Sequence, residues 1–199
     1  MSFSGFSSPG RFVDTSGGRA FRPRQLLVTD TFVERLAGSR IGATFNQYAD
    51  APELRFRLRR YLESRAHAPL LLVGEAAGFR GARVSGIPFT SERQLTGTGP
   101  SEATATIVHR VLNELGVEEQ VLLWNVVPTH PYRPGEPHSN RRPTADEIRA
   151  GLVFLCELVK GKRVVAVGRL AEAALGPPAV RHPSHGGAKA FREGLARLV

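Results

Sequence analysis

Three short segments of this sequence carry residue types that could bind a ligand and act on it. The segment VGEAAGFRGARVSGIPFTSE at 73–92 has glycines at 74, 78, 81 and 86, which let the backbone approach a ligand closely or adopt positive φ. Asn125 presents a donor and an acceptor in one plane. The turn His182-Pro183-Ser184 presents an imidazole that can donate a hydrogen bond or move a proton. These groups support hydrogen-bond recognition and acid–base or electrostatic catalysis.

Other interpretations of these residues have less support. Glycine-rich turns hold phosphates in nucleotide-binding proteins, but neither GxGxxG nor GxxxxGK[ST] occurs here, which argues against a dinucleotide site or a P-loop. The remaining alternative for 73–92 is a tight structural turn. A zinc site would have to use His130, His138, His182 and His185. No cysteine lies near them and their spacing matches no zinc finger or HExxH arrangement, so we expect no metal.

Buried strands and amphipathic helices must position these segments. Short apolar runs predict strands at 70–74, 120–125, 163–168 and 179–182. Apolar residues three or four apart predict helices at 53–66, 101–116 and 144–161. Thr144 and Glu147 form a capping box, while Gly116 and Gly161 suit the left-handed residue that ends a helix.

Strands that alternate with crossover helices predict an α/β fold with three α/β/α layers and a central, mostly parallel four-stranded sheet. Such sheets bind ligands beyond the carboxyl ends of their strands. Gly74-Glu75, Asn125 and His182-Pro183-Ser184 each follow one of these strand ends. The sequence therefore predicts a single site at that edge of the sheet.

Length and composition predict one ordinary globular domain. With 199 residues, 41% of them hydrophobic and 23% charged, we expect a domain at 26–199 preceded by a flexible Gly-, Ser-, Pro- and Arg-rich arm at 1–25. No apolar run is long enough to span a bilayer and no secretory leader is evident, so we expect a cytoplasmic protein without membrane contact.

The formal charge of +9 favours a polyanionic partner, although arginine bias from genome composition would produce the same excess. Only Lys160, Lys162 and Lys189 are lysines. The single cysteine, Cys156, lies in GLVFLCELV, where we expect it to be buried in the core. One cysteine can form neither an internal disulfide nor a multi-thiolate cluster.

The order and strand context of these motifs resemble the uracil-DNA glycosylase superfamily over residues 70–195. The chain is most similar to the branch whose first motif is GEAPG, here Gly74 to Gly78 with Ala77 in place of proline. The following GIPF segment, the NVV strand end and the HPS turn also match. That branch commonly holds an iron–sulfur cluster on four cysteines, which this chain lacks, so the resemblance implies a relative with no cofactor.

The resemblance implies a role for each residue in the site. His182 would donate to uracil O2 as negative charge builds on the departing base. Asn125 would recognise O4 and N3–H of uracil and reject cytosine. Phe89 would stack on the extruded base, and Glu75 would position the attacking water. Gly74, Ala76, Gly78 and Ser184 would complete the pocket.

Two positions of the first motif differ from the GQDPYH branch. Ala76 stands where that branch has its working carboxylate, so Glu75 could instead hold water or contact the base. Gly78 stands where that branch has a tyrosine that rejects the thymine methyl group. The sequence therefore predicts weaker exclusion of thymine and of other damaged bases.

We expect DNA to contact three basic or flexible regions near the motifs. They are the first motif, the loop at 128–143, and HGGAK at 185–189, where the last helix opens and His185 could wedge into the stack. The candidate residues are Arg80, Arg83, Arg141, Arg142, His185, Gly186, Gly187 and Lys189.

Together these features predict a monomeric, monofunctional glycosylase that flips uracil, or another deaminated base, from DNA and hydrolyses its glycosidic bond to begin base-excision repair. No lysine lies in a matching motif to form a Schiff base, so no strand cleavage is expected. Two alternatives remain open at this point. One is a catalytically weak damaged-DNA-binding protein of the same fold, and the other is a hydrolase of free nucleosides or nucleotides.

Overall fold

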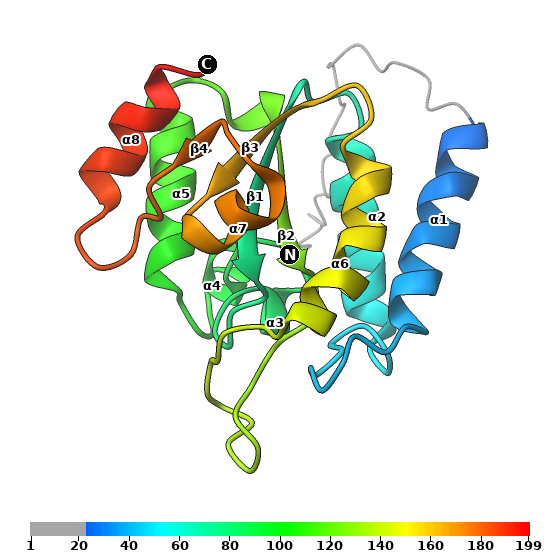
Figure 1. Cartoon of the computed structure of the whole chain (residues 1–199). Helices are drawn as coiled ribbons and strands as arrows, with labels where there is room; N and C mark the ends of the chain where they lie inside the picture. The colour runs from blue at the N-terminus through cyan, green and yellow to red at the C-terminus, as the bar shows by residue number, and fades with distance from the viewer. Residues whose placement is uncertain (1–22) are drawn as a thin grey trace, which may run out of the picture.

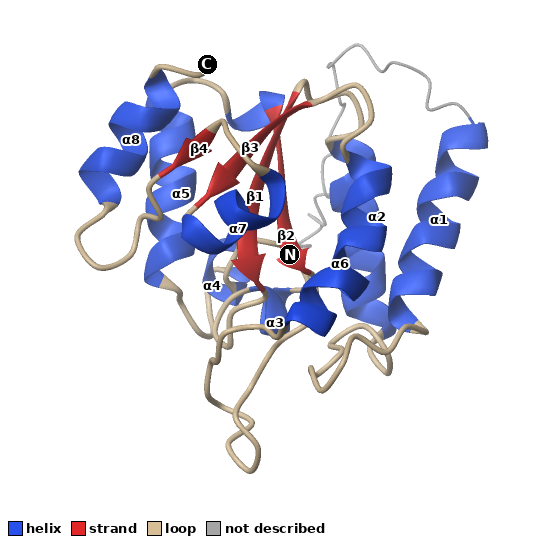
Figure 2. Ribbon diagram, viewed as in Figure 1, coloured by secondary structure: helices blue, strands red, loops and turns tan. Residues whose placement is uncertain are grey.

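The computed structural model describes residues 23–199 and contains one parallel sheet between two layers of helices (Figure 1, Figure 2). The sheet has the order β2-β1-β3-β4. Its strands are β1 (Leu70–Ala76), β2 (Val121–Val127), β3 (Arg163–Val167) and β4 (Ala179–Val180). The helices are α1 (Pro23–Ala37), α2 (Pro52–Ser64), α3 (Ala82–Ser85), α4 (Glu92–Thr96), α5 (Ala103–Glu114), η1 (Glu118–Gln120), α6 (Ala145–Leu158), α7 (Arg169–Leu175) and α8 (Ala188–Ala196).

Alternation of side chains along the strands supplies both faces of the sheet with apolar residues. Leu71 and Val73 of β1 face a core that includes residues of α1, α2, α6 and α7. Leu70 and Leu72 face a second core built with α5 and α8. This arrangement confirms the predicted three-layer α/β/α fold with a parallel four-stranded sheet.

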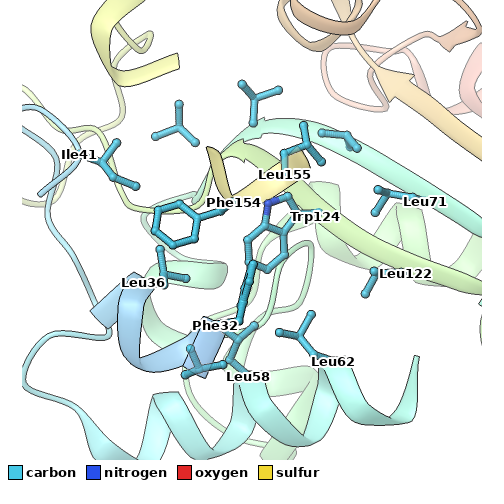
Figure 3. Close-up of a cluster of buried hydrophobic side chains, with 14 of the residues drawn as sticks. Phe32, Leu36, Ile41, Leu58, Leu62, Leu71, Leu122, Trp124, Phe154 and Leu155 are labelled. Carbon is cyan, nitrogen blue, oxygen red and sulfur yellow. The ribbon is translucent and has the colours of Figure 1, made fainter. Parts of the chain in front are cut away.

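Aromatic rings fill the larger of the two cores (Figure 3). Trp124 of β2 is fully buried, and the Phe32 ring lies edge-on to it with the ring centroids 5.7 Å apart. Phe154 of α6 makes the same kind of contact with Phe32. These contacts hold α1 and α6 against β2 immediately before the strand reaches Asn125.

The carboxyl ends of the strands open toward one edge of the sheet, from which the segment after β2 projects (Figure 1). This segment is tied back to the first motif. His130 Nδ1 lies 2.8 Å from the carbonyl oxygen of Ala77, and the Phe79 N–H donates to Asn140 Oδ1 at 2.9 Å. Residues from two strand exits are therefore fixed against each other before any ligand binds.

The predicted strands and the three predicted helices are confirmed within a few residues at each end. Thr144 and Glu147 form the expected capping box, and Gly116 and Gly161 both have positive φ. The expectation for Cys156 was wrong, because this residue is exposed. Phe154 and Leu155 point into the core, and the next residue along a helix is rotated by about 100°, which carries Cys156 to the solvent side.

The sequence analysis did not predict α1, which begins at Pro23, just before the expected end of the flexible arm. The rest of that arm, residues 1–22, lies outside the described residues. No helix in residues 23–199 is long and apolar enough to cross a membrane.

Candidate active site

A cavity of about 330 Å³ lies at the carboxyl edge of the sheet. It brings together side chains and backbone from the exits of β1, β2 and β4. Of the predicted pocket residues, Glu75, Ala76, Gly78, Phe89, Asn125 and His182 line it. Of the predicted DNA contacts, Arg141 and His185 also line it.

The first motif begins with Gly74, and the surroundings of this residue show why it is a glycine. It is the register partner of Asn125 on the neighbouring strand. A Cβ built on Gly74 would lie 2.3 Å from Phe89 Cζ and 2.8 Å from Asn125 Oδ1. Only a residue without a side chain lets the ring and the amide close over the strand.

Phe89 is held in an uncommon backbone conformation. It has φ of 53° and His185 has φ of 51°, and no other non-glycine residue in 23–199 has positive φ. Both residues line the cavity. Left-handed backbone is unfavourable for a bulky residue and persists where its surroundings fix it, often at binding sites.

The Asn125 amide is free to recognise a ligand. Its residue is only 4% exposed, and no described protein group hydrogen-bonds to its side chain. A buried amide without protein partners is costly unless something else satisfies it. A planar ligand with an acceptor and a donor on adjacent atoms would do so.

The hydrogen bonds around His182 determine where its ring proton lies. The Ser184 backbone N–H donates to His182 Nδ1 at 3.2 Å, and Ser184 Oγ lies 2.7 Å from the same nitrogen. A backbone N–H can only donate, so Nδ1 is the acceptor and the proton of the neutral ring is on Nε2. His185 Nδ1 lies 3.0 Å from Ser184 Oγ and donates to it, because the hydroxyl proton is already given to His182.

The surroundings of His182 keep its ring neutral. Burial lowers the pKa of His182 below its ordinary value, and the nearby charges of His185 and Arg181 lower it further. A neutral ring with its proton on Nε2 is a hydrogen-bond donor that carries no net charge. His182 can therefore donate to an oxygen on which negative charge develops.

The pKa of Glu75 is shifted in the opposite direction to that of His182. Burial raises the pKa of Glu75, and the positive charge of Arg142 partly opposes this. No described group hydrogen-bonds to its carboxylate, which lines both this cavity and a second one beside it. The carboxylate is thus available to hold a water molecule or to accept a proton.

The second cavity, of about 760 Å³, is rich in arginine. Its lining includes Arg142, Arg169 and Arg181, which are all exposed and form no salt bridge within residues 23–199. Arg142 acts on Glu75 only through its charge. Ser184 also lines it, and Glu75, His182 and His185 line both cavities, so the two adjoin. This basic surface suits the phosphates of a nucleic acid backbone.

Sequence reasoning missed Arg169 and Arg181 as candidates for this basic surface. Arg169 follows the exit of β3, and Arg181 directly precedes His182. Their positions next to strand ends were the available signal. The exit of β3, where Arg169 lies, carries none of the recognised motifs, and Arg181 lies one residue before the motif at the exit of β4.

Two of the arginines expected to contact DNA are engaged within the protein. Arg141 forms a two-pronged ion pair with the buried carboxylate of Glu147, at 2.6 and 2.7 Å. The Arg83 guanidinium lies over the Phe45 and Phe79 rings, 4.9 and 5.4 Å from their centroids. Both side chains order the loops at the rim of the site.

The other predicted DNA contacts lie at the surface around the site. Arg80 and Lys189 are exposed, and Lys189 lies 3.9 Å from Glu193. Gly186 has φ of 75°. Gly187 N–H donates to the Ser184 carbonyl, and a Cβ on Gly187 would lie 2.0 Å from the His182 carbonyl oxygen. Gly187 therefore allows the turn that carries His182 to close.

Glu102 is a further acidic residue in the cavity lining, and no sequence motif pointed to it. It precedes α5, far from the strand exits in sequence. Across residues 23–199, no group of three or more His, Cys, Asp or Glu side chains is placed to hold a metal ion.

The chain is similar to known proteins in sequence and in fold. The model of the Uracil DNA glycosylase superfamily matches residues 62–195. Among solved structures, wild-type SMUG2 of Pedobacter heparinus is similar, with 12% sequence identity and a TM-score of 0.59 over 85% of this chain and 95% of that one. At this identity the likeness shows the fold alone. No curated protein matches the chain.

The family match spans well over half of the chain and runs from the end of α2 through all four strands into α8. It includes every strand exit that contributes to the cavity. The resemblance noted in the sequence is confirmed: the chain belongs to the uracil DNA glycosylase superfamily.

Proposed function

We propose that this protein is a monofunctional DNA glycosylase that flips uracil out of DNA and hydrolyses its N-glycosidic bond, leaving an abasic site. The observation that carries the proposal is that His182, with its donor on Nε2, lines the same cavity as Asn125, whose amide forms no hydrogen bond with a described protein group. Superfamily membership supports glycosylase chemistry. The choice of uracil rests on the chemistry of the pocket.

Three groups account for recognition of the base. The Phe89 ring offers a flat apolar face, on which an extruded base can stack with little geometric demand. The Asn125 amide donates to uracil O4 and accepts from N3–H. Cytosine presents the reverse pattern at this edge, so an amide that keeps this orientation leaves cytosine without its hydrogen bonds and rejects it.

The reaction breaks the bond between C1′ and the base nitrogen, and the bonding electron pair leaves with the base. Negative charge collects on uracil O2, where His182 Nε2–H stabilises it by donating a hydrogen bond. Water held by Glu75 adds its oxygen to C1′ and gives up a proton, and one proton finally neutralises the uracil anion. The products are free uracil and an abasic sugar.

The arginine-lined surface beside the catalytic cavity would hold the DNA backbone. Arg142, Arg169 and Arg181 form no salt bridge among the described residues, so phosphates can pair with them without first breaking one. We also propose that the enzyme is a monomer, needs no metal or cofactor, and works in the cytoplasm.

The test is incubation with oligonucleotides that carry U opposite G, U opposite A, single-stranded U, hypoxanthine, or T opposite G, followed by alkali cleavage of abasic sites. Cleavage of the uracil strands after alkali, and intact strands without alkali, is the expected result. Tight binding without abasic sites would instead indicate a damage-binding protein. Turnover of free deoxyuridine that does not depend on salt would indicate a nucleoside hydrolase.

A further inference from the structure

Glu102 occupies an unusual position for a glutamate at a helix start. It is the N-cap residue of α5, with extended backbone at φ −123° and ψ 123°, yet its side chain makes no capping hydrogen bond. Side chains at this position usually satisfy free N–H groups of the first turn. The carboxylate of Glu102 turns away from the helix and lines the catalytic cavity instead.

The carboxylate lies against the backbone of the first motif. A Cβ on Gly78 would be 2.2 Å from Glu102 Oε1, and a Cβ on Gly81 would be 2.2 Å from Oε2. The two oxygens thus fill the space that side chains at 78 and 81 would take. No hydrogen bond to this carboxylate is formed within the described part of the chain, and burial raises the pKa of Glu102.

This place corresponds to one edge of the bound base. In the proposed complex, Asn125 binds the O4 and N3 edge, and the resemblance puts residue 78 beside the adjoining carbon 5. The chain has no side chain at 78, and the Glu102 carboxyl is the group that lies nearest to the place where such a side chain would begin.

We propose that Glu102 is a specificity-determining residue that recognises the 5-position of the extruded pyrimidine. This inference rests on the proposed function. A carboxyl oxygen accepts a hydrogen bond from a 5-hydroxymethyl or 5-hydroxy group, so pyrimidines with a hydroxyl at this position are favoured. A thymine methyl group desolvates the same oxygen and offers nothing in return.

The test measures kcat/KM for U, 5-hydroxymethyluracil and T, each opposite G, in the wild type and in Glu102→Ala. We expect the alanine variant to lose about tenfold in the ratio of 5-hydroxymethyluracil to U. We expect it to gain about tenfold in the ratio of T to U, because space opens beside carbon 5. Glu114→Ala, at the other end of α5, should leave both ratios unchanged and so controls for the helix.

A double variant separates the size of the group from its polarity. Gly78→Tyr in the Glu102→Ala background refills the space without a carboxyl group. Rejection of thymine should return, whereas the preference for the 5-hydroxymethyl group should not. Equal substrate ratios in the wild type and in Glu102→Ala, within twofold, would overturn the assignment.

The proposal about Glu102 and the proposed reaction can fail separately. Oligonucleotides with a 2′-fluoro substituent on the target sugar resist cleavage, and their Kd values report recognition alone. If the wild type excises no uracil, the proposed reaction is wrong. A Kd ratio between the 5-hydroxymethyluracil and uracil oligonucleotides that still collapses in Glu102→Ala would keep the recognition role, and an unchanged ratio would refute it.

Discussion

The Phe89 ring lies directly over Gly74, leaving no room for a side chain on this residue of β1. Gly74→Ala should therefore displace the ring, the Asn125 amide or both. Misplacement by about 1 Å can cost about 100-fold in rate, so we expect a loss of this size in single-turnover excision of uracil.

Gly38→Ala is the matched control, because the nearest atom to a Cβ on Gly38 is at an ordinary 3.5 Å. It should keep the wild-type rate. A Gly74→Ala enzyme with full activity would show that the close packing of Phe89 over the strand is not needed for catalysis.

The pH profile should report the neutral state of His182. Burial and the positive charges of His185 and Arg181 lower the pKa of His182 below 6.5, so the ring stays neutral as pH falls through that value. Protonation at lower pH puts a proton on Nδ1 and breaks the bond from the Ser184 N–H. We expect kcat/KM to be flat down to pH 6.5 and to fall below it.

Variants can show which residue causes the fall of kcat/KM at low pH, called here the acid limb of the profile. Arg181→Ala removes a positive neighbour and should move the limb of His182 to higher pH. His182→Ala should lower the rate by about 100-fold, the value of one preorganised donor of about 3 kcal/mol. Any limb that remains belongs to Glu75, whose pKa is raised above 4.5 and whose carboxylate is lost as pH falls. A profile unchanged by Arg181→Ala contradicts the assignment to His182.

The sequence predicted the parts of the site that follow strand ends. Apolar runs located the strands, and in a parallel sheet their carboxyl ends share one edge, so Glu75, Asn125 and His182 had to meet. Glu102 could not be predicted in this way, because its role depends on a side chain that leaves its own helix cap and crosses to Gly78. Local pattern carries no information about such a contact.

The sequence also did not show which arginine side chains pair with acidic residues of the protein. Arg141 and Arg142 are adjacent and look equivalent as letters, yet one is held by Glu147 and the other is exposed in the basic cavity. Which of two neighbouring side chains turns inward depends on the path of the whole loop. Cys156 was misplaced for a similar reason, because an apolar run wider than the buried face of a helix must leave some members exposed.

Protonation of Glu147 should make the protein less stable in acid. Hydrogen bonds from Arg141 are the main cause that lowers the pKa of Glu147 to about 2, from an ordinary 4.5, while burial opposes the shift. A carboxyl group with a depressed pKa in the folded state adds stability above pH 4.5 that is lost as pH falls toward 2. The linked contribution is about 3 kcal/mol.

Glu147→Gln should lose stability of this order at pH 7, measured as a lower midpoint of denaturant unfolding, and should flatten the pH dependence below 4.5. Asp146→Asn is the control on the neighbouring residue, because its side chain is 79% exposed in its pair with Arg149. If both variants unfold at the same midpoint, the Arg141–Glu147 pair does not stabilise the rim.

Arg169 should contribute to DNA affinity without selecting the base. Each phosphate contact that is lost lowers the slope of log K against log salt by about 0.9. Arg169→Ala should therefore weaken binding of uracil-containing and undamaged duplexes by similar factors and reduce this slope by about one, as measured by fluorescence anisotropy at several salt concentrations.

Arg197→Ala is the comparison for this measurement. Arg197 follows α8, and the neighbouring Leu198 carbonyl binds Arg163 at the start of β3, which is the opposite edge of the sheet from the site. It carries the same charge and should leave the slope unchanged. Equal slopes for Arg169→Ala and Arg197→Ala would show that only net charge matters.

The contact between Glu102 and Gly78 also limits how this site can evolve. In this chain the Glu102 carboxyl fills the space proposed to lie beside carbon 5, and a tyrosine at 78 would fill the same space. A lineage that changes from one solution to the other by single substitutions must pass either through a crowded site or through an empty one. The empty intermediate would attack thymine, an ordinary base of the genome, so selection against mutagenesis would keep the two lineages apart.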